Sequence, residues 1–149
     1  MGDNVHGSAV LVGTEAVLIR GPSGSGKSLL AFELICAGKS GLIAPTLLIG
    51  DDRLRLTRRD NTIEVGAVAI LAGLIEIRGL GLRRCAHCAA APLALVVDLA
   101  ATDGTRLPPL EALRTDILGI IVPRIPVPAG FTALPLVIAA LTTEALISD

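Results

Sequence analysis

The sequence has almost no aromatic residues: among its 149 residues it contains no Trp, no Tyr and only two Phe. Lysine is also scarce, since 11 of the 13 basic residues are arginine and only Lys27 and Lys39 remain. Hydrophobic residues make up 52% of the chain and are mostly Ala, Val, Leu and Ile. The length suits one domain, so we expect residues 1–149 to form a single domain with strands buried on both faces.

A membrane-spanning segment and an excess of charge are missing as well. The longest uncharged run, residues 125–143, contains three prolines, whereas a spanning helix needs about 20 apolar residues without such breaks. The chain does not begin with a basic segment followed by an apolar one, so we do not expect a secretory leader. Its three cysteines are an odd number and do not predict a disulfide framework. Thirteen basic and 14 acidic residues give a net charge of −1. We therefore expect a cytoplasmic protein with neither a nucleic-acid nor a membrane partner.

Short aliphatic runs separated by turn residues extend along the whole chain. Residues 2–4 are expected to be a loose terminus, and Gly38 is expected to stop the first helix. Many strands and few helices indicate a mixed α/β sheet rather than a regular series of strand–helix–strand units. We predict helices at 28–37 and 133–146, and strands at 8–12, 16–20, 46–49, 54–56, 62–65, 74–77, 93–97 and 119–122.

The most informative segment fits the pattern G-x-x-x-x-G-K-[ST] and lies between a predicted strand and a predicted helix. Glycines allow such a loop to point backbone N–H groups at phosphate oxygens, and the helix N-terminus adds partial positive charge. The lysine then reaches the β- and γ-phosphates, and the last hydroxyl coordinates Mg²⁺. The segment predicts binding of Mg-ATP, and it consists of Gly21, Pro22, Ser23, Gly24, Ser25, Gly26, Lys27 and Ser28.

Acidic residues near strand ends compete for the metal site that such a loop requires. Asp51 and Asp52 follow the predicted strand 46–49, and Asp98 follows the predicted strand 93–97. Two adjacent acids can divide the work, one toward the metal and one as general base toward a hydroxyl. Aspartates are also common in ordinary turns, so the residues alone leave this choice open.

Glu76 is a third acid of interest because apolar residues flank it. In a strand it would share one face with Leu74 and Arg78. It is therefore either a functional acid or one half of a structural ion pair with Arg78.

These segments, in this order, resemble the HPr kinase/phosphorylase family. The resemblance rests on His6-Gly7, the phosphate-binding loop, Asp51-Asp52-Arg53 and residues 74–82, Leu-Ile-Glu-Ile-Arg-Gly-Leu-Gly-Leu, and it extends to about residue 141. The family phosphorylates a serine of the phosphocarrier protein HPr, and it shares its fold with phosphoenolpyruvate carboxykinase. The resemblance implies an α/β P-loop kinase domain of that type, with a mixed β-sheet and few helices. Since the carboxykinase also carries an Ile-Gly-Asp-Asp segment, the resemblance favours the acidic pair at 51–52 over Asp98.

The resemblance also implies a role for each site residue. Lys27 would hold the phosphates of ATP, and Ser28 with Glu76 would bind Mg²⁺. One of Asp51 and Asp52 would be the general base toward the HPr serine, with Asp52 favoured.

Two further residues receive roles from the same resemblance. His6 would lie near the base, and Arg106 would stabilise the charge of the phosphoryl group, ahead of Arg78 and Arg124. HPr would be the partner, in regulation of the phosphotransferase system, and the protein would form a homo-oligomer.

Departures from the family pattern limit these expectations. The chain resembles the short alphaproteobacterial forms of the family, which consist of the catalytic part alone. Residues 128–132 replace the family's Arg-Pro-Gly-Arg-Asn segment for dephosphorylation. We therefore expect kinase activity with doubtful phosphorylase activity. A nucleotide-binding regulatory module without transfer and a small-molecule P-loop kinase are the alternatives. Because aromatic residues are nearly absent, we expect loose recognition of the nucleotide base.

Overall fold

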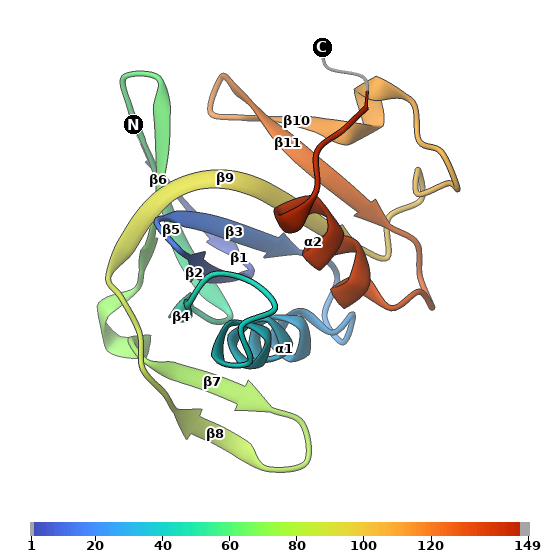
Figure 1. Ribbon diagram of the computed structural model, residues 1–149. Helices are drawn as coiled ribbons and strands as arrows, with labels where there is room; N and C mark the ends of the chain where they lie inside the picture. The colour runs from blue at the N-terminus through green and yellow to red at the C-terminus, as the bar shows by residue number, and fades with distance from the viewer. Residues whose placement is uncertain (1, 147–149) are drawn as a thin grey trace.

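The computed structural model describes residues 2–146, which form a nine-stranded mixed sheet, a separate two-stranded hairpin and two helices (Figure 1). Two short 3₁₀ helices, Ala69–Leu71 and Leu110–Leu113, lie in the connections. The strands and helices are β1 (Gly2–His6), β2 (Ser8–Val12), β3 (Glu15–Arg20), α1 (Lys27–Lys39), β4 (Thr46–Gly50), β5 (Arg53–Arg59), β6 (Thr62–Ala67), β7 (Leu74–Ile77), β8 (Gly81–Arg84), β9 (Ala90–Leu99), β10 (Arg114–Ile117), β11 (Ile120–Val127) and α2 (Ala133–Thr142).

Strand β9 holds the large sheet together. The strand order is β1-β5-β6-β9-β3-β2-β4, and β11 pairs with both β9 and β10. The first residues of β9 pair antiparallel with β6, whereas its later residues run parallel to β3 on one side and to β11 on the other. In Figure 1 this strand forms a long curved arch that connects the two parts of the sheet.

The aliphatic residues form two clusters, one on each face of the sheet. Along β3, Val17 and Ile19 pack in the cluster beneath α1 and α2, and Ala16 and Leu18 pack in the opposite cluster. The side chains of a strand alternate between faces, so a continuous apolar strand such as this one fills both clusters. The expectation of strands buried on both faces is confirmed.

The predicted strands and helices are present, but the structure differs from the prediction at three points and contains two further strands. Residues 2–4 are not loose, because they belong to β1, which pairs along its length with β5. They show no apolar pattern that would predict a strand, and backbone pairing with β5 holds them in place. Helix α1 continues through Gly38 to Lys39, so Gly38 is not its stop. Helix α2 ends at Thr142, four residues earlier than predicted. Strand β8, whose residues are all exposed, and strand β10, of which two of four residues are exposed, were not predicted.

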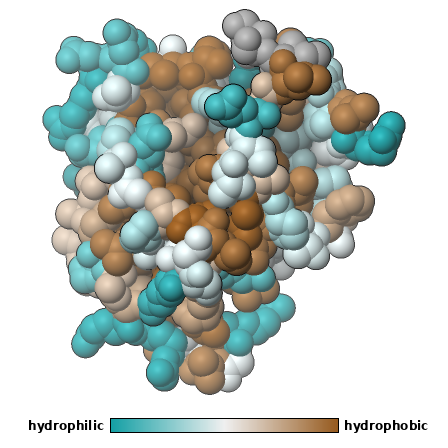
Figure 2. Space-filling model, in the orientation of Figure 1, coloured by the Kyte–Doolittle hydropathy of each residue, from teal (hydrophilic) through white to brown (hydrophobic). Residues whose placement is uncertain are grey.

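Within residues 2–146 no helix is long and apolar enough to cross a membrane. Helix α1, the longer of the two, has 13 residues. In the orientation of Figure 1, hydrophobic surface lies near the middle of the face and in further patches toward its top and right, with hydrophilic side chains between them (Figure 2).

Strand directions bring four carboxyl ends to one edge of the sheet. Strands β3, β9 and β11 are parallel, and β4 runs the same way as β3 because both pair antiparallel with β2. Ligands of sheets with parallel strands bind in the crevice beyond these carboxyl ends. The phosphate-binding loop after β3 and the acidic pair after β4 are therefore placed together.

Candidate functional site

The phosphate-binding loop joins β3 to α1, as predicted, and encloses open space. Gly24 and Gly26 have φ values of 81° and 100°, a left-handed region that glycine adopts without strain. A Cβ added at either glycine would meet no atom within 4 Å. No side chain caps the start of α1, so its first N–H groups remain available to a ligand. This geometry fits phosphate groups, which bind at such helix N-termini.

Lys27 lies at the first position of α1 with its ammonium group folded over the loop. The Nζ atom donates to the carbonyl oxygens of Gly21 and Pro22, at 2.8 and 3.0 Å. Lys27 also lines the large cleft beside the loop. The ammonium group is thus held where bound phosphates would be, and a phosphate would compete with the two carbonyl oxygens for it.

Asp51 connects the segments that form the site. Only 6% of it is exposed, and its carboxylate accepts hydrogen bonds from three other segments. The Ser8 hydroxyl at the start of β2 donates at 2.5 Å, the Ser28 hydroxyl in α1 at 2.8 and 2.9 Å, and the Glu76 backbone N–H in β7 at 3.0 Å. Asp51 therefore orients the Ser28 hydroxyl and fixes β7 against the loop.

Asp52 is placed differently from its neighbour. Its side chain is exposed and lines the cleft, and no hydrogen bond of its carboxylate is found among residues 2–146. Its backbone has a φ of 72°, an unfavourable conformation for a residue with a Cβ, and its carbonyl oxygen accepts from the Gly7 N–H at 3.2 Å. His6 pairs in register with Arg53, the residue after Asp52, and is not among the residues that line the cleft. The two aspartates thus have separate positions, one buried against the loop and one open to the cleft.

The cleft has a volume of about 1070 Å³ and lies between the phosphate-binding loop, the acidic pair and the β7–β8 hairpin. Glu76 and Arg78 both line it. Among the residues that the structure describes, Glu76 and Arg78 form no ion pair with each other, and Glu76 is exposed. The ion-pair interpretation of Glu76 is therefore not supported, and its carboxylate is available to a ligand.

The oxygen donors around the loop fit Mg²⁺ bound together with a nucleotide. They are the Ser28 hydroxyl and the Glu76 carboxylate, which both line the cleft, and Asp51 accepts the hydrogen bond of that hydroxyl. No group of three or more His, Cys, Asp or Glu side chains that could hold a metal is found in residues 2–146. Mg²⁺ in nucleotide sites is held by one or two carboxylates with substrate phosphates and water, so such a group is not required.

Asp98, the competing acid, is part of a different structure. Its side chain is 16% exposed and lies between two arginines. Arg20 donates from Nε and Nη2 at 2.7 and 2.8 Å, and Arg124 donates from Nε at 2.5 Å. Burial alone would raise the pKa of Asp98, but hydrogen bonds from Arg20 and Arg124 and their positive charge outweigh it and lower the pKa. This carboxylate ties the end of β3, directly before the loop, to β9 and β11, and it is not free for a metal.

The three arginines considered as stabilisers of phosphoryl-group charge lie in three different places. Arg106 is exposed in the connection after β9 and does not line the cleft. Arg124 is bound to Asp98 and also to Asp103, at 2.7 and 3.0 Å. Arg78 is the one of the three that lines the cleft.

Ser8 was not anticipated as a site residue. No sequence pattern marks it, because its contact with Asp51 depends on the pairing of β2 between β3 and β4. That pairing brings the first residue of β2 to the edge where β4 ends.

Comparisons with known proteins agree with this fold. Residues 2–144 match the family model described as HPr Serine kinase C-terminal domain. The Hpr(Ser) kinase/phosphatase from Coxiella burnetii superposes with a TM-score of 0.73 at 28% identity, covering 93% of both chains.

Curated relatives match over about half of the chain. The HPr kinase/phosphorylase of Levilactobacillus brevis is 42% identical over 80 residues, and that of Lactiplantibacillus plantarum is 44% identical over 80 residues. Each alignment covers 53% of this chain and 24% or 23% of the relative, so the chain aligns with about a quarter of their length. Since the family model spans nearly all of the described residues, the chain belongs to the family of the HPr serine kinase C-terminal domain.

Proposed function

We propose that this protein transfers the γ-phosphoryl group of ATP to a serine hydroxyl of HPr and so regulates the phosphotransferase system. The separation of the two aspartates carries the proposal. Asp51 is buried against Ser28 of the loop, while Asp52 opens onto the cleft where an acceptor would lie. The names of the Levilactobacillus and Lactiplantibacillus relatives support HPr as that acceptor.

In the proposed reaction, the loop N–H groups and Lys27 bind the phosphates of ATP in line with the incoming hydroxyl. Ser28, oriented by Asp51, and Glu76 would hold Mg²⁺, which would neutralise phosphate charge when bound. Asp52 accepts the proton of the serine hydroxyl. The serine oxygen forms a bond to the γ-phosphorus as the bond from that phosphorus to the bridging oxygen breaks, and ADP leaves.

Two further residues complete the proposed site. His6, in β1, pairs with Arg53, which follows Asp52, and it would position the Asp52 carboxylate. Arg106 is the residue that the family resemblance implies for charge stabilisation, while the position of Arg78 in the cleft supports Arg78 in that role. We place the reaction in the cytoplasm, in a single domain that assembles as a homo-oligomer.

The proposal is tested by incubating the purified full chain with [γ-³²P]ATP, Mg²⁺ and HPr of the same organism. Wild type should label HPr, Lys27→Ala should lose both ATP binding and labelling, and Asp52→Asn should bind ATP but not transfer. Asp51→Asn should lose transfer and also stability, because it is buried. If Asp52→Asn keeps full transfer, the proposed base is wrong.

A paired comparison separates the candidate arginines. Arg78→Ala and Arg106→Ala should be measured side by side, and the residue that stabilises the phosphoryl group should lower kcat far more than the affinity for ATP. If neither variant changes kcat, charge stabilisation comes from another group.

A regulatory module without transfer is the second candidate. It is favoured by residues 128–132, which contain no charged side chain where the family has its dephosphorylation segment. ATP binding with no label on HPr would support this candidate over the kinase. A label on a small-molecule acceptor instead would indicate a small-molecule kinase. For the kinase itself, we propose that adding phosphorylated HPr and inorganic phosphate gives only weak reversal.

A further inference from the structure

Arg20, the last residue of β3, is joined to Asp98 of β9 by two parallel hydrogen bonds. The two residues lie opposite each other in the parallel pairing of β3 with β9. The Nε atom of Arg20 donates to one carboxylate oxygen at 2.7 Å, and Nη2 donates to the other at 2.8 Å. A bidentate pair fixes the plane of the guanidinium group as well as its distance, which a single hydrogen bond does not. The end of β3 is therefore held in one orientation.

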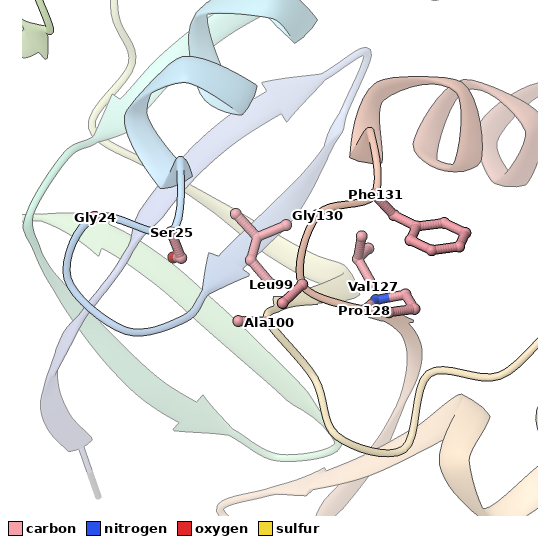
Figure 3. A pocket seen from close by; sticks show the side chains of 9 residues that line it. Gly24, Ser25, Leu99, Ala100, Val127, Pro128, Gly130 and Phe131 are labelled. Carbon is pink, nitrogen blue, oxygen red and sulfur yellow. The ribbon is translucent and has the colours of Figure 1, made fainter.

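The next residue of the chain is also held by β9. Gly21, the first residue of the phosphate-binding loop, packs between Ser25 and Leu99. A Cβ added at Gly21 would lie 2.6 Å from the Ser25 hydroxyl oxygen and 3.1 Å from the Leu99 Cβ. Figure 3 shows the Leu99 side chain beside Ser25 of the loop. Two consecutive residues of β9, Asp98 and Leu99, thus hold the end of β3 and the start of the loop.

The start of the loop carries the two carbonyl groups that hold Lys27. Its ammonium group donates to the carbonyl oxygens of Gly21 and Pro22 at 2.8 and 3.0 Å. The Pro22 carbonyl also accepts from the Ser25 N–H at 3.0 Å, which closes this part of the loop. Because Arg20 directly precedes both carbonyl groups, a displacement of Arg20 would move them and the ammonium group with them.

Arg20 does not face either cavity next to the loop. It is absent from the residues that line the large cleft, and also from those that line a smaller cavity of about 240 Å³ beside Gly24 (Figure 3). Besides the two bonds to Asp98, its guanidinium group donates a longer bond of 3.4 Å to the Thr115 hydroxyl. Any influence of Arg20 on a bound phosphate is therefore exerted through the loop.

Arg124 provides a comparison within the same cluster of charges. It donates from Nε to Asp98 at 2.5 Å, and it also binds Asp103 and the Ala112 carbonyl oxygen. Arg124 lies in β11, which pairs with β9 on the side away from β3. Removing Arg124 would weaken the cluster but leave the two bonds between Arg20 and Asp98 in place.

We infer that Arg20 is a positioning residue of the phosphate-binding loop: its pairing with Asp98 holds the Gly21 carbonyl where that group orients Lys27 toward phosphate. Groups that act on phosphate are effective when they are held in place before the ligand arrives. The consequence for ATP rests on the proposed function, whereas the orientation of Lys27 is a property of the chain without ligand.

The first test measures how fast Lys27 reacts with an acetylating reagent in the full chain without nucleotide. Lys27 and Lys39 are the two lysines of the sequence, so Lys39 is an internal standard for mass spectrometry. The ammonium group of Lys27 must leave both carbonyl oxygens before its nitrogen can react. Arg20→Gln, which lacks the charge and the fork, should raise the ratio of Lys27 to Lys39 acetylation by about three- to tenfold. Arg124→Gln is the matched control and should leave the ratio within about twofold.

The second test measures binding of MgATP and of magnesium tripolyphosphate by calorimetry, at a temperature where thermal unfolding shows each variant to be folded. Arg20→Gln should weaken both ligands by about five- to tenfold, because both bind through their phosphates. Arg124→Gln should change neither affinity by more than about twofold. If Arg20→Gln does not fold, Arg20→Lys replaces it in both tests, because it keeps the charge and loses the bidentate pair. Fragment spectra distinguish its additional lysine from Lys27.

The outcomes separate this inference from the proposed function. Unchanged acetylation of Lys27 in the Arg20 variant overturns the inference, and so does unchanged affinity when wild type binds both ligands. Equal changes in Arg124→Gln would show that the whole cluster acts through general stability, which also overturns it. If wild type binds neither ligand, the proposed function fails, and the acetylation ratio alone decides whether Arg20 orients Lys27.

Discussion

Replacing Asp98 by Asn should destabilise the protein more than any change at its surface ion pairs. The carboxylate accepts three hydrogen bonds from Arg20 and Arg124. An Asn of the same shape keeps one acceptor oxygen, loses the bonds to the other, and removes the negative charge between two guanidinium groups. A hydrogen bond to a charged group contributes about 1.5–3 kcal/mol, so Asp98→Asn should lower the free energy of unfolding by about 2–3 kcal/mol at pH 7. For a chain of this length that lowers Tm by roughly 8 °C.

The pH dependence of this loss follows from the lowered pKa of Asp98. An aspartate in an unfolded chain has a pKa of about 3.9, and the pKa of Asp98 in the folded protein lies below that value. The ionised carboxylate therefore stabilises the fold above about pH 4, and this contribution is lost as the pH falls through the folded pKa. Since Asn does not titrate, the difference between wild type and variant should be full at pH 7 and shrink below about pH 4.

Urea unfolding of both proteins at several pH values measures this difference. Glu64→Gln is the matched control, because Glu64 pairs with Arg59 at 3.4 Å on the surface, and such pairs contribute less than about 1 kcal/mol. A loss below about 0.5 kcal/mol for Asp98→Asn at pH 7, or a loss that stays constant down to pH 3, would refute the reasoning.

Three further predictions concern packing and exposure. Gly38→Ala should destabilise the protein by more than about 1 kcal/mol, because the new Cβ would lie 2.8 Å from the backbone nitrogen of Thr46. This is opposite to the gain that alanine usually gives in a helix, and a lowered Tm in thermal unfolding would show it. Ser8→Ala should cost about 1 kcal/mol through the lost bond to Asp51, and an unchanged Tm would contradict this. Cys36 is exposed, whereas burial raises the pKa of the Cys85 and Cys88 thiols. Mass spectrometry at pH 7 should therefore find Cys36 modified first by a maleimide, and equal rates at all three would count against it.

The phosphate-binding loop could be predicted from the sequence because its function depends on local chemistry. Glycines, one lysine and one hydroxyl within eight consecutive residues define it, and the flanking strand and helix follow from the apolar pattern. Strand β1 could not be predicted in this way. Its residues show no apolar alternation, and it exists because β5 offers an edge for backbone pairing.

The roles of the aspartates needed the fold. Asp51 and Asp52 are adjacent in the sequence and chemically identical, yet one is buried and bonded to Ser28 while the other is exposed with a φ of 72°. Asp98, which follows a strand just as they do, is bound by two arginines from neighbouring strands. These differences depend on contacts between residues far apart in the chain, which a local pattern does not contain.

The sequence by itself therefore determined the loop, the aliphatic strands and the family, since each is recorded in short segments of neighbouring residues. Only the tertiary structure decided which acid meets the loop, which arginine reaches the cleft and where a second cavity opens beside Gly24. The physical reason is strand order: placing β2 between β3 and β4, and β9 between β3 and β11, sets which carboxyl ends meet. Hydrogen bonds across that sheet edge then fix each side chain in its place.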